Sequence, residues 1–254
     1  MRLVVLSLCA AAVALLGARS ATSTPATAAA GAAPPDIPQS YVFGSGKLSP
    51  MRPGVTYQAS RFPIALRVTP PDASWGAAQW KANQFPPDEI ATRHLKCSTT
   101  PAVCKPPYYG WVAIGPRGTY SGPPPGLIVV LAGYSHVPSV ATTVANLRRG
   151  KNLELQPAHP VRLAGFSGLQ FEGQTAGAKH LFIPFTPPSY GAAGGGAADL
   201  IQMDGADHPF LFDVLNVRGK TVVVLVGSLV LSPDAFPPFR AKAVRLLQSL
   251  RFPG

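Results

Sequence analysis

The stretch FLFDVLNVRGKTVVVLVGSLVL, residues 210–231, decides the expected fold. Two apolar runs, 210–217 and 221–231, are joined by Arg218-Gly219-Lys220, where the glycine supplies the positive φ of a tight hairpin turn. The second run is apolar on both faces, so its strand must be covered on both sides or lie at the centre of a sheet. We therefore predict a long, buried hairpin.

An amphipathic helix is expected after the hairpin, over residues 234–250. Asp234 is a suitable N-cap, and Pro237 and Pro238 are tolerated in a first helical turn. Apolar side chains then recur on one side of the helix, and basic side chains on the other. The apolar side comprises Phe236, Phe239, Ala243, Leu246, Leu247 and Leu250. Burying it on the hairpin stabilises the domain by several kcal/mol, at about 1.5–3 kcal/mol for each large side chain.

Shorter patterns extend the sheet toward the N-terminus. Residues 127–132 (LIVVLA) form an apolar run between turn residues, which predicts a buried central strand. A short helix should follow over 138–149, with Gly150 as its stop signal. The other expected strands are 57–68, 109–114, 160–166, 168–172 and 180–185, with a tight turn at Gly165-Phe166-Ser167-Gly168. The fold class is therefore α+β, built on a mainly antiparallel sheet with a C-terminal amphipathic helix.

Three of these segments resemble exported domains with the PsbP-like fold, a group that includes actinobacterial LpqN-type proteins. FPIALRVTPPDASWG (62–76) is similar to their opening strand and Pro-x-x-Trp pattern, and VRLAGFSGLQFEG (161–173) to their short strand pair. The end of the chain resembles them most, with VVVLVG (222–227), AFPPF (235–239) and LLQSLRF (246–252). The resemblance implies an α/β/α sandwich that acts as a binding or assembly module, and it brings no catalytic residues.

The first twenty residues are typical of an export signal. A basic start at Arg2 precedes an uncharged apolar stretch from Leu3 to Leu16, and Ala18 and Ser20 fit cleavage before Ala21. The apolar stretch is shorter than the about 20 residues that a membrane-spanning helix needs. We therefore expect a cleaved signal peptide at 1–20 and a secreted, extracytoplasmic protein.

The rest of the chain divides into a spacer and one domain. Residues 21–40 are small, polar and proline-rich, which indicates a disordered spacer. Residues 41–254 are expected to form a single domain with irregular insertions at about 84–126 and 187–198. Cys9 is preceded by Leu8 rather than by the small residue of a lipoprotein signal, so no lipid anchor is expected.

Two cysteines remain once the signal is removed, Cys97 and Cys104. In an oxidising compartment such an isolated pair is expected to form a disulfide, which closes a short loop and contributes about 2.5 kcal/mol. His94 lies nearby, but the ligands that a metal site would still need are missing.

The charge is strongly basic, with 22 basic and 11 acidic residues. Loss of Arg2 and Arg19 with the signal leaves 20 − 11, a net charge of about +9. Apart from Arg148, Arg149 and Lys151 the basic residues occur singly, and the protein is exported, so nucleic acid is not an expected partner. Anionic envelope components such as phospholipid headgroups or cell-wall polymers remain an alternative.

The best enzyme candidate is Ser135 in Gly133-Tyr134-Ser135-His136-Val137, between a buried strand and a helix. This is the setting of a nucleophile elbow, with Asp204 and His208 in the chain order of triad partners. The fifth position of the motif is Val137 instead of glycine, however, and no oxyanion motif precedes it. A serine esterase is therefore the alternative interpretation.

No cofactor or metal site is expected. The acidic stretch with Asp204, Asp207 and His208 is too short for a calcium-binding loop and fits a turn before the hairpin. The irregular half of the chain instead gathers the aromatic residues Trp75, Trp80, Tyr108, Tyr109, Trp111 and Tyr120. They are the predicted binding surface for an unknown protein or small ligand. The alternative interpretation is that they cover the open end of the core. The leading hypothesis is a secreted, non-catalytic binding domain.

Overall fold

A computed structural model describes residues 33–40, 46–81, 109–121, 124–134, 138–148, 153–176, 207–227 and 232–254. The described residues from Pro34 onward belong to one compact unit, Pro34–Gly254. Of the helices that the structure describes, none has both the length and the hydropathy needed to span a bilayer. The predicted signal peptide, most of the spacer, the 180–185 strand and the 187–198 insertion lie outside the described residues.

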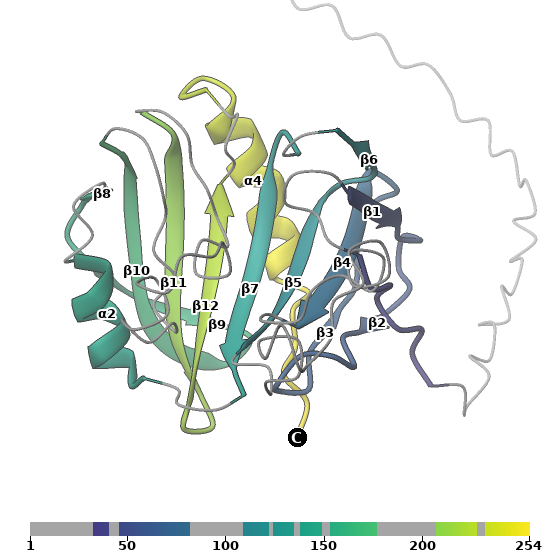
Figure 1. The fold of residues 1–254 in the computed structure, drawn as a ribbon, viewed down its shortest axis with the longest axis horizontal. Coiled ribbons are helices and arrows are strands. Elements are labelled where there is room, and N and C mark those ends of the chain that lie inside the picture. The colour runs from purple at the N-terminus through teal and green to yellow at the C-terminus, as the bar shows by residue number, and fades with distance from the viewer. Residues whose placement is uncertain are drawn as a thin grey trace, which may run out of the picture. The chain divides into compact units, whose positions relative to one another are not determined.

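A ten-stranded sheet with antiparallel pairing forms the body of the unit (Figure 1). The strand order is β6-β1-β4-β5-β7-β12-β11-β10-β8, and β9 also pairs with β10. The strands are β1 (Gly46–Pro50), β4 (Trp75–Lys81), β5 (Tyr109–Pro116), β6 (Gly118–Tyr120), β7 (Leu127–Gly133), β8 (Leu153–Leu155), β9 (His159–Leu163), β10 (Phe166–Thr175), β11 (Pro209–Val217) and β12 (Lys220–Gly227). A second, two-stranded sheet pairs β2 (Tyr57–Gln58) with β3 (Arg67–Val68).

The predicted hairpin is confirmed as β11–β12, at the centre of the sheet. Its turn consists of Arg218 and Gly219 alone, and both have positive φ, at 53° and 81°. This is the type I′ geometry that matches the twist of the flanking strands. The side-chain oxygen of Asn216 accepts a hydrogen bond from the Gly219 N–H at 2.8 Å. Strand β12 lies between β11 and β7, which explains why its sequence is apolar at successive positions.

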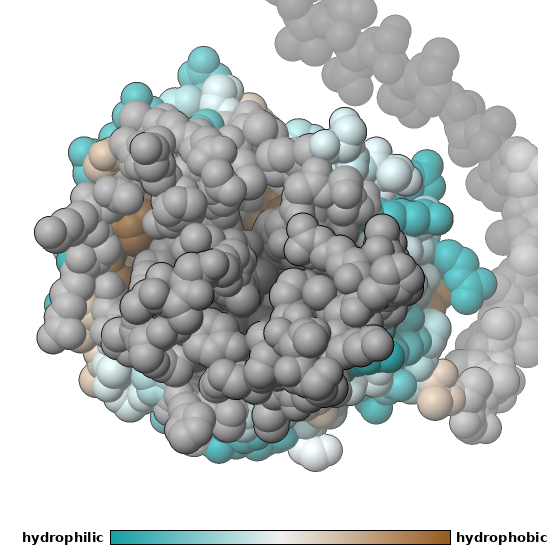
Figure 2. Space-filling model, in the orientation of Figure 1, coloured by the Kyte–Doolittle hydropathy of each residue, from teal (hydrophilic) through white to brown (hydrophobic). Residues whose placement is uncertain are grey.

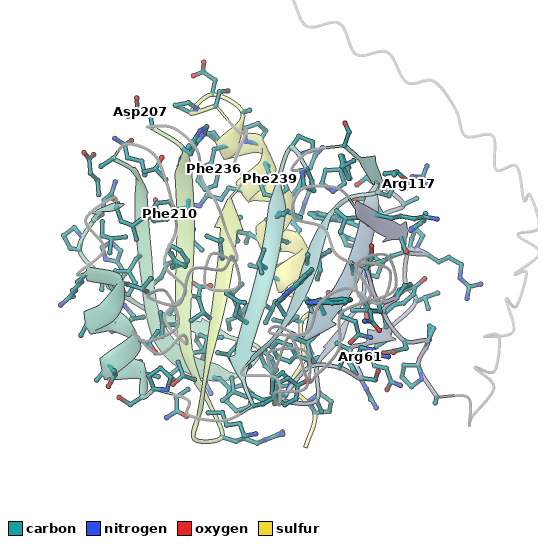
Figure 3. All side chains as sticks on the ribbon, viewed as in Figure 1. Arg61, Arg117, Asp207, Phe210, Phe236 and Phe239 are labelled. Atoms are coloured by element: carbon teal, nitrogen blue, oxygen red, sulfur yellow. The ribbon has the colours of Figure 1, made fainter. Side chains whose placement is uncertain are left out.

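One helix packs on each face of the sheet. Helix α4 (Phe236–Leu247) buries Phe236, Phe239, Ala243, Leu246 and Leu247, and is seen behind β7 in Figure 1. Figure 3 shows Phe236 and Phe239 on its first turns. Helix α2 (Val140–Arg148) packs Val144 and Leu147 into the other face. The predicted N-cap was wrong, because Ala235 occupies the cap position without a side-chain hydrogen bond, while Ser232 accepts the N–H groups of Ala235 and Phe236.

Several segments differ from the sequence prediction. The expected strand at 57–68 is two short strands, β2 and β3, because the chain turns back at 60–64 around Pro63, which has no N–H to donate. Within the expected 84–126 insertion, the predicted strand at 109–114 is confirmed as β5, and residues 118–120 form the unpredicted strand β6. The expected turn at Gly165–Gly168 is instead formed by Ala164 and Gly165, with φ of 51° and 87°. Gly168 therefore lies inside β10.

The domain also begins earlier than the sequence indicates. Residues 34–40 were expected to belong to a disordered spacer, but they pair with the sheets. Asp36 bridges to Gln58 and Gln39 to Gln79, both in parallel. The side chain of Ile37 is 1% exposed and packs into the core on the α4 face.

Candidate ligand-binding groove

The predicted aromatic surface does not come together on one face. Trp75 belongs to the core on the α4 side, whereas Trp80 and Trp111 are direct cross-strand partners in the core on the α2 side. They are 3%, 4% and 0% exposed. The split follows from strand alternation, because side chains five residues apart on β4 point to opposite faces.

The described tyrosines of that predicted surface belong to two strands, β5 and β6. Tyr120 is half-buried on β6, and its hydroxyl donates to the Pro116 carbonyl at 2.6 Å. Tyr109 begins β5, while Tyr108 lies outside the described residues. Figure 2 shows that the right-hand edge of the unit, near β1 and β6, is mainly hydrophilic.

Most of the residues proposed for catalysis, and both cysteines proposed for the disulfide, lie outside the described part of the chain. Ser135, Cys97, Cys104 and Asp204 all lie outside the described residues. Asp207 and His208 precede β11, where each donates its backbone N–H to Thr175, at 2.8 and 3.1 Å. No group of three or more His, Cys, Asp and Glu side chains gathers within the described part of the chain.

An open groove lies beside the C-terminal end of α4. Its volume is about 630 Å³. Three parts of the chain build it: the β2–β3 sheet, the β9–β10 turn and the segment that follows α4. The lining residues are Thr56, Arg67, Thr69, Ala164, Ser249, Arg251, Phe252 and Pro253. A ligand in this groove would contact basic, hydroxyl and apolar side chains together.

Arg67 and Arg251 are neighbours in the lining of the groove because their backbones are paired. Each donates its N–H to the carbonyl of the other at 2.9 Å. Nη1 of Arg251 donates to the carbonyls of Gln248 and Leu250, at 2.7 and 2.6 Å, which fixes this guanidinium at the end of α4. The guanidinium of Arg67 makes no hydrogen bond or ion pair within the described part of the protein.

A third arginine holds the wall of the groove in place. Arg218, in the β11–β12 turn, donates to the carbonyls of Pro253 and Phe252, at 2.6 and 2.8 Å. Its guanidinium carbon lies 5.8 Å from the centre of the Phe166 ring, and Phe166 packs edge-on against Phe252 at 5.9 Å. These contacts attach the segment after α4 to the β11–β12 turn and to β10.

The sequence does not reveal this groove because its parts are far apart along the chain. Ser249 accepts a hydrogen bond from the Thr69 N–H at 3.1 Å, although the two residues are 180 positions apart. The basic residues involved occur singly, which the sequence alone associates with a solvated surface. The pairing of Arg67 with Arg251 would have indicated the groove, but this pairing is visible only in the structure.

A second polar cluster lies between the sheet and α4. Asp213 of β11 is 2% exposed, and its Oδ1 accepts a hydrogen bond from Gln170 Nε2 at 2.8 Å. Burial raises the pKa of Asp213 to about 6, while the Gln170 hydrogen bond and the charge of Arg240 act in the opposite direction. Arg240 also forms a two-pronged ion pair with Glu172, which joins α4 to β10.

No family model matches the chain, and no curated protein is similar to it in sequence. Among solved structures, it is similar to the solution structure of cyanobacterial PsbP (CyanoP) from Synechocystis sp. PCC 6803. The sequence identity is 10%, and the alignment covers 85% of this chain and 92% of that chain, with a TM-score of 0.27. A score this low provides no residue correspondence to transfer between the two proteins.

Proposed function

We propose that this protein is a secreted, non-catalytic binding domain whose contact surface is the groove beside the end of α4. The signal sequence supports secretion, and no catalytic set is expected from the sequence. The observation that carries the proposal is the guanidinium of Arg67, which has no partner among the described residues and lies in a groove whose other walls are held by internal hydrogen bonds. A pre-formed concave surface with a few polar groups is typical of a ligand site.

We also propose a specific architecture for this binding domain. With α4 on one face of the sheet and α2 on the other, the unit is arranged as an α/β/α sandwich of the PsbP-like kind. Helix α4 is amphipathic in this arrangement, since Lys242 and Arg245 are exposed opposite its buried side. We propose that this framework presents the groove to a protein or small ligand at or outside the cell envelope.

Filling the groove tests this function. Thr56 lines the groove and is exposed, so Thr56→Trp should block it without changing the charge or the core. We expect the wild-type secreted protein to co-sediment with the envelope fraction of the producing organism, and Thr56→Trp to remain in solution. Thr119→Trp is the matched control, because Thr119 is exposed on the edge strand β6.

Equal sedimentation of all three proteins would exclude the groove as the contact surface. A separate assay addresses the esterase alternative. If the purified secreted protein hydrolysed a generic ester and lost this activity in Ser135→Ala, the proposal of a non-catalytic domain would be refuted.

A further inference from the structure

We propose that the groove binds a phosphate-bearing polymer of the cell envelope, with Arg67 and Arg251 as the residues that contact its phosphate. The proposal rests on the groove being the contact surface described above. It adds the chemical class of the ligand and the side chains that recognise it.

The first observation is the placement of two positive charges directly opposite each other. Like charges at paired positions destabilise neighbouring strands. Arg67 and Arg251 are held in that arrangement by two backbone hydrogen bonds of 2.9 Å. Between described residues, the only ion pair is the one that joins Arg240 and Glu172, so no described carboxylate neutralises either arginine. An anion between the two guanidinium groups would convert their repulsion into attraction.

The second observation concerns the hydrogen-bond donors that remain for a ligand. A guanidinium carries five N–H donors, and Arg251 uses those of Nη1 for the carbonyls of Gln248 and Leu250. Its remaining donors are held in a fixed position, and the side-chain donors of Arg67 have no acceptor among the described residues. Because phosphate oxygens are arranged tetrahedrally, one phosphate can meet guanidinium planes from two strands, whereas the two oxygens of a carboxylate lie in one plane.

The third observation favours a polymer over a lipid bilayer. The groove volume of about 630 Å³ lies in the range of pockets that hold ligands larger than a single anion. Proteins that bind a bilayer surface usually insert apolar side chains into it. Among the described residues, Val244 is the only exposed large hydrophobic side chain, at 42%. A hydrated chain of phosphate esters fits the arginine and hydroxyl side chains of the groove better than a membrane does.

The test measures binding of the secreted protein to soluble polyglycerol phosphate by titration calorimetry. Arg67→Gln should lower the affinity by about tenfold or more, the size expected for losing hydrogen bonds to a charged group. Arg67→Lys keeps the positive charge but loses the planar, two-pronged donor of the guanidinium. Its affinity should therefore lie between those of Arg67→Gln and the wild type. Arg67 carries the test because its side chain has no partner to lose in the described part of the chain, so these variants should unfold at the wild-type temperature.

Arg117→Gln is the matched control for charge. Arg117 is exposed near β6 at the upper right of Figure 3, whereas the C-terminus, which follows the groove residue Pro253, is marked at the lower edge of Figure 1. At physiological salt its loss should change the affinity by less than about twofold, because distant charges are screened. An equal loss for Arg117→Gln and Arg67→Gln would refute the proposal, since binding would then depend only on net charge.

Two further ligands separate the phosphate polymer from its alternatives. Equally tight binding of polyglutamate would overturn the choice of phosphate. Arg67-dependent binding to phosphatidylglycerol vesicles, without binding to the polymer, would overturn the choice of a polymer. If Thr56→Trp abolishes envelope binding while Arg67→Gln retains it, the groove remains the contact surface and only the ligand class is wrong. If neither variant changes envelope binding, both proposals fail.

Discussion

Asp213 places a carboxyl group between the sheet and α4, on the same face of β11 as the core residues Leu211 and Leu215. Burial raises its pKa to about 6, from 3.8 in an unfolded chain. The native state therefore binds this proton more tightly than the unfolded state does. As a result, the contribution of Asp213 to stability is largest at acidic pH and is lost as the pH rises from about 4 to about 6.

Asp213→Asn should remove this pH dependence. The asparagine keeps an oxygen that can accept the Gln170 hydrogen bond, and it never ionises. We expect the free energy of unfolding at pH 7.5 to rise by about 2 kcal/mol, and the two proteins to converge near pH 4. Urea denaturation at several pH values measures this. Asp234→Asn is the control, because Asp234 is exposed, and an unchanged pH slope in Asp213→Asn would contradict the argument.

The sequence could not have identified Asp213 as special. One acidic residue within an apolar run is compatible with a strand that exposes one edge to water. What makes Asp213 unusual is its position under α4, beside Gln170 of β10. That position depends on pairing between strands that are far apart in the chain.

At the scale of elements, strand β10 depends on a residue without a side chain. Gly168 is paired with Leu215 on one side and with Val161 on the other. A Cβ atom at this position would overlap the Val214 carbonyl oxygen and would lie 2.9 Å from the Cα of Leu215. Both are backbone atoms of β11, so neither can move without disturbing the β10–β11 pairing.

Gly168→Ala should therefore lower the free energy of unfolding by about 1–3 kcal/mol, as overpacking usually does. Ser167→Ala is the matched control, because Ser167 is the exposed neighbour on the same strand. Its effect should stay within about 0.5 kcal/mol. Thermal and chemical unfolding of the two variants compare them directly, and similar losses in both would show that the close approach is not what matters.

Elements with a strong local pattern were predictable from sequence, and elements defined by partners were not. The apolar run of β7 and the β11–β12 hairpin carry their own signals, namely length, β-branched residues and a glycine turn. Strand β4 has the small residues Gly76, Ala77 and Ala78, which give no strand pattern. It becomes a strand because β1 and β5 pair with its two edges.

At the scale of the whole unit, residues 34–40 act as a strap that closes one side of the core. Ile37 is its anchor, and its N–H donates to the Gln58 carbonyl at 2.8 Å. Asp36 accepts hydrogen bonds from Ser60 and from the buried Gln79. The strap is thus held by both apolar and polar contacts.

Ile37→Ala should destabilise the unit by about 2–4 kcal/mol, through lost burial and the cavity that remains. Gln39→Ala should cost less than about 0.5 kcal/mol, because the Gln39 side chain is exposed. Chemical denaturation of both variants provides the comparison. If Ile37→Ala were as stable as the wild type, the strap would not be part of the folded core.

The groove likewise exists only at this scale. None of its residues stands out in its local sequence. Arg67, Ser249 and Arg251 line one groove because β3 contacts the segment after α4. The predicted aromatic surface failed to assemble for the corresponding reason. Trp75 and Trp80 are close in sequence, but they lie on opposite faces of β4.

The small β2–β3 sheet has a consequence for how the protein is made. Asp36 pairs with Gln58, Gln58 with Arg67, and Arg67 with Arg251, so a single row of backbone pairs links the first and last parts of the unit. That row cannot be completed until residue 251 has been synthesised. Contacts over such long sequence separations form slowly. The groove, which needs the pairing of Arg67 with Arg251, is therefore among the last features of the unit to form during synthesis.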